Sequence, residues 1–283
     1  MRITDPGPEP ALPRPAAPAQ TTDSGPGPAL PRPAAPALAA DGARRLVAGL
    51  SVVLPCSGAQ AAGVDEAIRA TAAAAARSSL HYEIVVVDDG GGAETARAAA
   101  RFVDGARPVR LLVHPHPRGY GAAVRTGLDA ARMPWVLLGS PEEELTATDL
   151  GDFAALSRTA DVVAGRRTHR SDPPVARLLD AAWNRLLRVL FDLPVHDVAC
   201  PFKLIRRDLL EGLGLRSNGA LIAAELLVRC RAEGARIAEH PIRHRPRASA
   251  ARRRVRAGAA VAGIAELARR QRELRRLSRT VAA

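Results

Sequence analysis

Short runs of valine, isoleucine and leucine alternate with alanine-rich segments through the middle of the chain, and this alternation restricts the possible folds most strongly. The runs predict strands at 50–55, 83–88, 109–114, 135–138, 161–165 and 236–240. The segments between them predict helices at 60–78, 93–104, 121–132, 174–191 and 219–233. Continuous apolar strands that alternate with helices form parallel sheets with both faces covered. We therefore predict an α/β domain with a mostly parallel sheet covered by helices on both faces.

The two ends of the chain differ in composition from this middle part. Residues 1–45 are rich in proline and alanine, and ALPRPAAPA occurs at both 11–19 and 29–37. Such a segment buries too little apolar surface to fold, so we expect a disordered leader; a proline-rich recognition motif is the alternative. The folded domain is expected over 46–248. Residues 249–283 predict a basic helical tail.

Composition excludes several classes of protein. The 283 residues, 47% of them hydrophobic, suffice for one sizeable core. Neither a long apolar run nor a signal-peptide pattern is seen, so we expect a cytoplasmic protein. Cys56, Cys200 and Cys230 match no zinc-ligand spacing and are expected to be buried thiols. The net charge is +12, and the excess arginine is concentrated after residue 242.

Acidic residues followed by glycines end the strand predicted at 83–88. This segment reads Asp88-Asp89-Gly90-Gly91-Gly92. Ligands of parallel sheets bind beyond the carboxyl ends of the strands, and glycine allows a backbone to come close to a ligand. The segment therefore suits recognition of a nucleotide, although an acidic strand end followed by glycine also forms ordinary helix caps.

Five segments, taken in order, resemble one enzyme family. They are SVVLP, EIVVVDDG, RGYGAAVRTGLDAA, DVACPFKLIRRDLL and NGALIAAELLVR, between about Leu50 and Arg247. This pattern is similar to family 2 glycosyltransferases, in particular to the catalytic domains of polyprenyl-phosphate (dolichyl-phosphate-like) mannose or glucose synthases. The resemblance implies a nucleotide-diphospho-sugar transferase (GT-A-like) domain. It also implies transfer of a hexose from a nucleoside diphosphate sugar to an acceptor, often a polyprenyl phosphate, with Mg²⁺ or Mn²⁺.

The resemblance also implies roles for individual residues. Expected donor-binding residues are Pro55, Asp88, Asp89, Gly119 and Gly121. Expected phosphate- or acceptor-binding residues are Arg166, Arg167, Arg170, Lys203, Arg206 and Glu225. Each arginine has a solvated surface role as its alternative. Lys203 is the single lysine of the sequence, which favours a specific role or is chance, and Glu225 is alternatively a helical partner of Arg229, four residues on.

The sequence departs from the family where the metal is expected. In GSPEEELTATDL, over 139–150, the family's Asp-x-Asp falls on Ser140-Pro141-Glu142 and its companion glutamine on Glu144. Magnesium needs only one or two protein carboxylates when phosphates and water complete its shell. We therefore expect Glu142 and Glu144 to be the catalytic metal ligands, with Glu143 in reserve.

Two further motifs are also weakened. The loop Pro55-Cys56-Ser57-Gly58-Ala59-Gln60 carries neither an aromatic nor a charged side chain, and Gly91-Gly92-Ala93-Glu94 lacks the usual hydroxyl and aspartate. Two interpretations follow, a divergent transferase with altered donor and metal use, or a catalytically silent homologue that binds a ligand or partner.

The arginine-rich C-terminal segment supports a third hypothesis. From Arg243 onward, thirteen arginines stand against Glu266 and Glu273. Such a segment could bind nucleic acid or an anionic membrane electrostatically. Because no aromatic residue accompanies the arginines, base stacking is not supported and nucleic acid is the less favoured partner. Peripheral contact with the inner face of the membrane would suit a lipid-phosphate acceptor, and a solvated basic tail is the alternative.

Overall fold

The computed structural model describes residues 49–56, 61–78, 81–91, 97, 102, 108–170, 172–243, 245 and 252–280. The predicted leader over 1–45 and most of the helix predicted over 93–104 lie outside these residues. None of the described helices combines the length and apolarity needed to cross a membrane.

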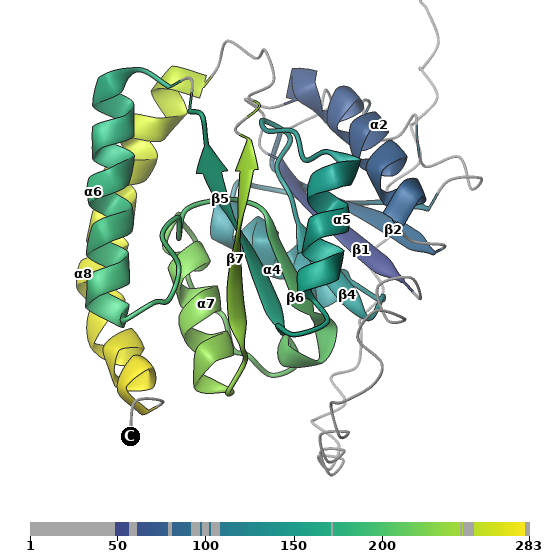
Figure 1. Ribbon diagram of the computed structural model, residues 1–283. Helices are drawn as coiled ribbons and strands as arrows, with labels where there is room; N and C mark the ends of the chain where they lie inside the picture. Colours follow the sequence, from purple (N-terminus) through teal and green to yellow (C-terminus); the bar gives the residue numbers. More distant parts are fainter. Residues whose placement is uncertain are drawn as a thin grey trace, which may run out of the picture. The chain divides into compact units, whose positions relative to one another are not determined.

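A seven-stranded sheet forms the centre of the molecule (Figure 1), with the strand order β3-β2-β1-β4-β6-β5-β7. Its strands are β1 (Leu50–Cys56), β2 (Tyr82–Asp89), β3 (Val109–His114), β4 (Trp135–Leu138), β5 (Val162–Thr168), β6 (Lys203–Arg206) and β7 (Ile237–Arg243). β6 runs antiparallel to its neighbours β4 and β5, whereas the pairs β1–β2, β1–β4, β2–β3 and β5–β7 are parallel. The predicted mostly parallel sheet is confirmed.

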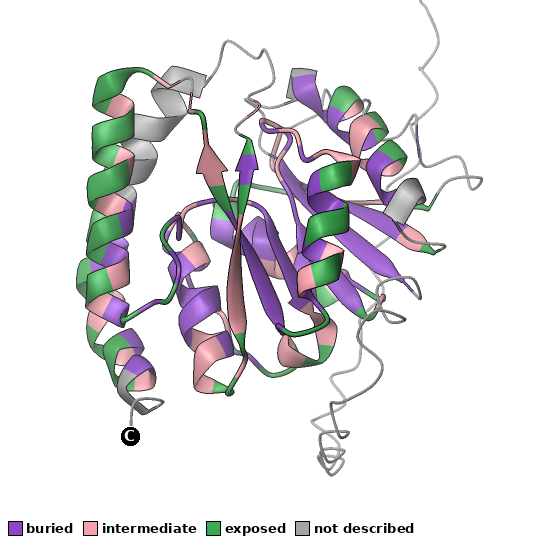
Figure 2. Ribbon diagram, in the orientation of Figure 1, coloured by how far each residue is buried: buried purple, intermediate pink, exposed green. Residues whose placement is uncertain are grey.

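Helices cover both faces of the sheet. One face packs against α4 (Tyr120–Ala130), α6 (Pro174–Phe191), α7 (Ile222–Ala232) and α8 (Arg252–Thr280), which supply core residues such as Val124, Leu187, Leu226 and Leu267. The other face packs against α2 (Ala61–Ser78) and α5 (Ala147–Leu156). Side chains of the central strands alternate between these two cores, as a pleated strand requires: Val53 faces the first core, and Val52 and Leu54 face the second. Figure 2 shows these strands buried along their length.

Two elements were not predicted from the sequence. Helix α5 has Thr146 as its N-cap; the Thr146 side chain accepts from the Asp149 amide while the Asp149 carboxylate accepts from the Thr146 amide, a reciprocal capping box. Strand β6 has only four residues, and its antiparallel placement between β4 and β5 brings Lys203 beside Leu138. A short 3₁₀ turn, η2 (Arg207–Leu209), follows β6.

The C-terminal helix was predicted as a tail beyond a domain boundary at 248. In the structure Leu267 and Leu274 of α8 belong to the same core cluster as the sheet. Glu266 of α8 accepts hydrogen bonds from the amides of Asn218 and Gly219, at 2.7 and 3.2 Å. From Gly263 onward the helix therefore packs as part of the folded unit.

The connections define where a ligand can bind. The chain passes from β1 to β2 and β3 on one side, and then returns to β4 on the other side of β1. In open α/β sheets the crevice beyond the carboxyl ends at such a reversal is the general ligand site. The carboxyl ends of β1, at Cys56, and of β4, at Leu138, therefore border the candidate site.

Candidate functional site

Asp88, Asp89 and His114 lie together at the carboxyl edge of the sheet. The register aligns Cys56 of β1 with Asp88 of β2, and Asp89 with His114 of β3. Pro55 is buried within β1, opposite Val87. The prediction that the ends of β1 and β2 share one edge is thus met by the register, while the donor-binding roles of these residues remain predictions.

The carboxylate of Asp89 holds the loop that leads into α4. It accepts hydrogen bonds from Nδ1 of His114 and from the amides of Arg118 and Gly119, each at 2.8 Å. Burial by itself would raise the pKa of Asp89, but these hydrogen bonds outweigh it and lower the pKa below the ordinary value. Asp89 therefore stays ionised, and its bonds serve to position residues 118 and 119.

One carboxylate oxygen of Asp88 lacks a partner among the residues that the structure describes. Its Oδ1 accepts from the Gly91 amide at 2.7 Å, whereas Oδ2 is buried and has no hydrogen-bond partner among the described residues. Burial raises the pKa of Asp88, and the neighbouring Asp89 charge acts in the same direction. Because buried polar atoms are nearly always paired, this oxygen marks a place where a ligand donor would fit.

The N-terminus of α4 is covered rather than open. The Gly121 amide donates to the Asn218 carbonyl at 2.8 Å, and a side chain at 121 would meet the Ser217 carbonyl oxygen at 2.3 Å. Gly119 has φ 100°, which glycine adopts readily. The expectation that this helix end faces a diphosphate therefore does not hold for the Gly121 amide, since Asn218 occupies it.

Burial alternates along the loop that follows β4. Pro141, Glu143 and Leu145 are buried, whereas Glu142 and Glu144 are half-buried, as expected for side chains on opposite sides of an extended segment. The Glu142 amide donates to Oγ of Ser140 at 3.1 Å. No hydrogen bond or ion pair involves the carboxylate of Glu142 or Glu144 within the described part of the chain. These two carboxylates are therefore available to a ligand.

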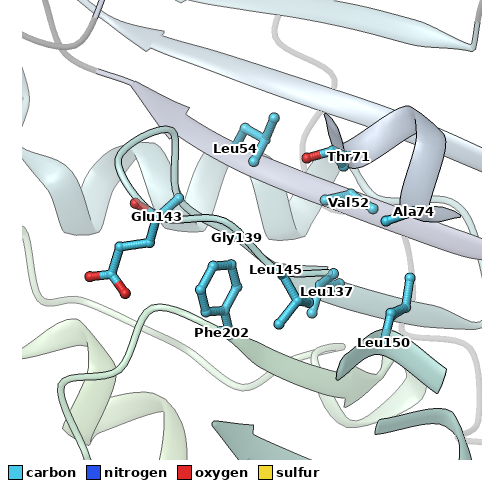
Figure 3. Close-up of a pocket in the computed structure, with 11 residues that line it drawn as sticks. Val52, Leu54, Thr71, Ala74, Leu137, Gly139, Glu143, Leu145, Leu150 and Phe202 are labelled. Atoms are coloured by element: carbon cyan, nitrogen blue, oxygen red, sulfur yellow. The ribbon is translucent and has the colours of Figure 1, made fainter. Parts of the chain in front are cut away.

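A small, mostly apolar pocket lies beneath this loop. It is lined by residues of β1, β4, α2 and α5 together with Leu145 and Phe202 (Figure 3). The carboxylate of Glu143 points away from the apolar side chains in this view. Its polar lining side chains are Thr71, Ser140 and Glu143, and the Glu143 carboxylate is paired with Arg167, so we assign the pocket to the packing of the loop.

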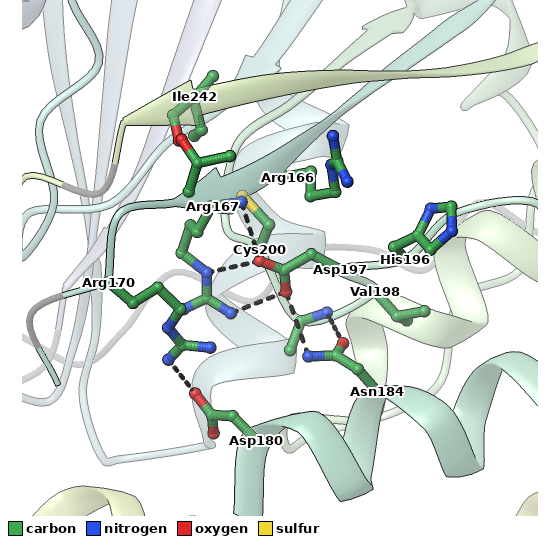
Figure 4. Close-up of polar contacts among 12 residues, drawn as sticks. Arg166, Arg167, Arg170, Asp180, Asn184, His196, Asp197, Val198, Cys200 and Ile242 are labelled. Carbon is green, nitrogen blue, oxygen red and sulfur yellow. Dashed lines mark hydrogen bonds and ion pairs between the residues drawn. The ribbon is translucent and has the colours of Figure 1, made fainter. Parts of the chain in front are cut away.

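Arg167 connects this loop to β5 and to the segment before β6 (Figure 4). Its Nε and Nη2 each donate to the Asp197 carboxylate at 2.8 Å, and its Nη1 lies 3.4 Å from Oε1 of Glu143. Asn184 of α6 donates to Asp197 at 3.3 Å and accepts from the Ala199 amide at 2.9 Å. Burial would raise the pKa of Asp197, but the Arg167 hydrogen bonds lower it, so the pair is charged.

The other predicted arginines lie in different surroundings. Arg166 is 46% exposed at its side chain and its Nε lies 3.7 Å from the Glu239 carboxylate. Arg170 is paired with Asp172 and Asp180. Arg206 lies at the opposite edge of the sheet, aligned with Trp135 at the start of β4 and paired with Asp161 and Asp208. The structure therefore does not bring Arg206 together with the other predicted phosphate-binding residues.

Lys203 lies beside the carboxyl end of β4, at the edge of the sheet where a phosphate-binding residue was expected, but its side chain is fully buried. Its ammonium donates to the carbonyls of Val198, at 3.1 Å, and Cys200. Burial lowers the pKa of Lys203, and the nearby Cys200 and Asp197 oppose this shift. The ammonium closes the turn between residues 198 and 203, a role that the sequence did not indicate.

Glu225 of α7 is also buried and internally bonded. It accepts from the amides of Arg216 and Ser217 and from the side chains of Arg229 and Arg270, all between 2.7 and 3.1 Å. The alternative prediction of an Arg229 partner is confirmed, and Arg270 adds a contact from α8. Glu225 thereby fixes the loop at 216–218 that covers the start of α4.

Sequence reasoning named Glu143 only as a reserve metal ligand, and it assigned no role to Asp197 or Tyr120 at this edge. Tyr120 starts α4; burial of its hydroxyl end raises its pKa, and the carboxylates of Glu143 and Glu142 act in the same direction. Asp197 stands in the quoted DVACPFKLIRRDLL segment, but the sequence gives no signal of its pairing with Arg167, 30 residues away.

The residues of the loop after β4 fit a hard divalent cation only in part. Glu142 and Glu144 offer two carboxylates, which suffices for Mg²⁺ or Mn²⁺ when a diphosphate and water complete the shell. Among the described residues no group of three or more His, Cys, Asp or Glu side chains converges as a preformed metal site.

Comparison with known proteins agrees with this geometry. Residues 51–214 match the model of glycosyl transferase family 2. The chain is 39% identical over 158 residues to an uncharacterized glycosyltransferase of Mycobacterium tuberculosis, covering 54% of this chain and 69% of the relative. It is 33% identical over 141 residues to a dolichyl-phosphate hexose transferase of Haloferax volcanii, covering 48% of this chain and 61% of that protein.

Solved structures share the fold. The glucosyl-3-phosphoglycerate synthase of Mycobacterium tuberculosis, in complex with Mn²⁺, UDP and phosphoglyceric acid, has a TM-score of 0.61 at 20% identity, over 81% of this chain and 82% of that one. A mannosyltransferase of Pyrobaculum calidifontis, in complex with GDP-mannose and Mn²⁺, has a TM-score of 0.53 at 19% identity, over 78% and 64% of the two chains. The chain belongs to glycosyl transferase family 2 and has a GT-A fold.

Proposed function

We propose that this protein transfers a hexose from a nucleoside diphosphate sugar to an acceptor of the polyprenyl-phosphate class. One observation carries the proposal: β2 ends on Asp88 and Asp89, with Oδ2 of Asp88 unpaired among the described residues, and the available carboxylates of Glu142 and Glu144 lie in the loop that follows β4; these two strands flank β1. The dolichyl-phosphate hexose transferase of Haloferax volcanii, at 33% identity, supports the acceptor class.

Each group has a defined part in this proposal. Asp88 accepts a hydrogen bond from an N–H of the base or from a ribose hydroxyl, which satisfies its buried oxygen. Glu142 and Glu144 are the residues that would hold a divalent cation. When bound, that cation neutralises the charge that develops on the leaving diphosphate. Arg166 of β5, whose side chain is more exposed than those of Arg167 and Arg170, contributes a further positive charge.

A catalytically silent homologue is the second candidate function. It is favoured by the internal use of Arg167, Lys203 and Glu225, each of which is bonded to protein groups. It is also favoured by Ser140, because a hydroxyl is a weaker ligand for a hard cation than a carboxylate. A protein of this kind would bind a nucleotide or a partner without transferring sugar.

Titration calorimetry with UDP- and GDP-sugars, with and without Mg²⁺ or Mn²⁺, tests the donor site. We expect metal-dependent binding of one nucleotide class, and Glu142→Gln/Glu144→Gln should abolish the metal dependence. The matched control is Glu143→Gln, which changes the adjacent residue that is paired with Arg167 and should retain metal-dependent binding. Absence of nucleotide binding under every condition would exclude the transferase.

A transfer assay separates the two candidate functions once binding is established. The purified protein, the bound nucleotide sugar and a short-chain polyprenyl phosphate are incubated, and the lipid product is measured by mass spectrometry. Sugar on the lipid phosphate supports the enzyme. Donor binding with neither transfer nor hydrolysis on any polyprenyl phosphate would support the silent homologue instead.

A further inference from the structure

The chain just beyond β7 lies against the loop at 139–146, which carries Glu142 and Glu144. The amide of Glu144 donates to the carbonyl of Arg245 at 2.9 Å. Nη1 of Arg245 lies 3.1 Å from Oδ2 of Asp149, and the two side chains are 36 and 13% exposed. Arg245 therefore makes two contacts here, one through its backbone at Glu144 and one through its side chain at the start of α5.

Strand β7 places Arg245. It pairs with β5 as far as Thr168 and Arg243, and Oγ1 of Thr168 donates to the Ile242 carbonyl at 3.0 Å. The Ile242 side chain is buried in the core that also contains Leu150 of α5. Arg245 follows the last residue of β7 by two positions, so strand pairing fixes where this part of the chain leaves the sheet.

Helix α5 is held against β7 by a separate contact. The rings of Phe153 and His240 meet edge to face, with their centroids 5.8 Å apart, and Figure 1 shows α5 beside β7. The Asp149 carboxylate accepts from the amide and the hydroxyl of Thr146, at 3.0 and 2.6 Å, where the loop enters α5. Asp149 is thus shared between the cap of α5 and Arg245.

Two arginines hold consecutive residues of this loop. Arg167 of β5 pairs with the Glu143 carboxylate, and the carbonyl of Arg245 accepts from the next amide. Successive side chains of an extended segment point to opposite sides, so contacts that fix the backbone at 143 and 144 also direct the carboxylates of Glu142 and Glu144. The affinity of a metal site depends on such supporting contacts as well as on its ligands.

We propose that Arg245 is a positioning residue of the donor site, which holds the backbone at Glu144 so that the carboxylates of Glu142 and Glu144 are presented together. It acts through Glu144 and contacts no substrate group itself. The metal part of this proposal rests on the proposed function, whereas the holding of the loop does not. Arg245, one of the thirteen arginines from residue 243 onward, is therefore assigned to an internal contact.

Hydrogen exchange of the full, ligand-free chain tests the contact without a donor or a metal. Mass spectrometry follows peptides that cover 139–146. We expect Arg245→Gln to speed exchange of the loop amides about threefold or more, since the change removes the side-chain contact with Asp149. Arg245→Lys keeps a positive charge for Asp149 and should exchange at nearly the wild-type rate.

The matched control is Arg243→Gln. It removes the same charge from an exposed side chain at the end of β7 and should leave exchange of the loop unchanged. Thermal melting confirms that each variant is folded. Unchanged exchange of the loop in Arg245→Gln, or equal acceleration in Arg243→Gln, would overturn the proposal.

Titration calorimetry with Mn²⁺, in the presence of UDP or GDP, tests the consequence for the metal. Arg245→Gln should weaken the apparent Mn²⁺ affinity about tenfold and leave nucleotide affinity without metal unchanged. Faster loop exchange with unaltered Mn²⁺ affinity would make Arg245 a purely structural residue. A wild-type chain that binds no Mn²⁺ with either nucleotide would refute the proposed function and the metal part of this proposal, while the exchange experiment still decides whether Arg245 holds the loop.

Discussion

Arg167 and Glu143 join the loop after β4 to strand β5, with 3.4 Å between Nη1 and Oε1. Both side chains are buried, with 5 and 7% exposure. The pairing has a consequence for the row of three glutamates at 142–144. Because Glu143 forms this internal ion pair, Glu142 and Glu144 remain for a ligand. The same arginine is fixed by two bonds to Asp197, which makes Asp197 a support of the whole loop.

Replacement of Asp197 by asparagine should destabilise the fold. The ion pair with Arg167 is buried, and removal of one charge leaves the other unpaired in a poorly solvated place. We expect a loss of about 3 kcal/mol in the free energy of unfolding, measured by urea denaturation. The control is Asp208→Asn, whose half-exposed carboxylate pairs with Arg206 and should contribute less than about 1 kcal/mol. Equal effects of the two changes would contradict the assignment.

The stability difference between wild type and Asp197→Asn should depend on pH. The folded-state pKa of Asp197 is lowered, so its ionised form stabilises the protein at every pH above the unfolded pKa of about 3.9. This stabilisation is lost as the pH falls through the lower, folded pKa. Melting temperatures measured from pH 7 downward should therefore diverge most at neutral pH and converge below about pH 4. A constant difference over this range would rule out the charged pair.

The fold could be predicted from the sequence largely because its signals are local. Apolar strand runs and alanine-rich helices are readable within short windows, and the carboxyl ends of parallel strands meet by geometry alone. Strand β6 was missed because a run of four residues is too short to show a strand pattern. Helix α5 was missed because its capping box lies in the GSPEEELTATDL stretch, which was interpreted only as a metal-binding motif. The packing of α8 depends on Leu267 and Leu274 meeting α7, which no local pattern reports.

The candidate site was less predictable because the tertiary fold, and not the local sequence, determines which of its charged residues pair with one another. Asp197 lies 30 residues from Arg167, and Arg270 lies 45 residues from Glu225. A sequence shows the charges of such residues but not whether they face a ligand or one another. The exposure of Val175, Leu178 and Leu179 on α6 was not predicted for a related reason, since the helical pattern of apolar residues does not reveal which side is buried.

Gly121 should not tolerate even a methyl group. A Cβ at this position would lie 2.3 Å from the Ser217 carbonyl oxygen and 2.9 Å from the Asn218 carbonyl carbon, and both are backbone atoms that Glu225 and Glu266 hold in place. We predict that Gly121→Ala lowers the free energy of unfolding by about 2 kcal/mol. Chemical denaturation measures it.

The matched control for this prediction is Gly151→Ala. Gly151 lies in helix α5, where an added Cβ has nothing within 4 Å. Alanine is the better helix former, so this change should stabilise the protein by about 0.5–1 kcal/mol. If Gly121→Ala were also neutral or stabilising, the loop at 217–218 would not lie against the start of α4 as described.

We expect the Asp88 carboxylate to lower the stability of the fold at neutral pH and to contribute to nucleotide binding. Burial raises its folded-state pKa, so the folded protein is penalised for ionising this carboxylate as the pH rises above the unfolded value of about 3.9. Asp88→Asn keeps an acceptor for the Gly91 amide and removes the charge. We predict that it raises the free energy of unfolding by about 1 kcal/mol at pH 7 and has little effect below pH 4.

The same Asp88→Asn change should weaken nucleotide binding at least about tenfold, since it removes the carboxylate oxygen that is proposed to accept a hydrogen bond from the nucleotide. Thermal melts at the two pH values and calorimetry with the nucleotide measure both effects. A variant that binds as tightly as wild type would remove Asp88 from the donor site, and a destabilised one would show that its charge has a partner.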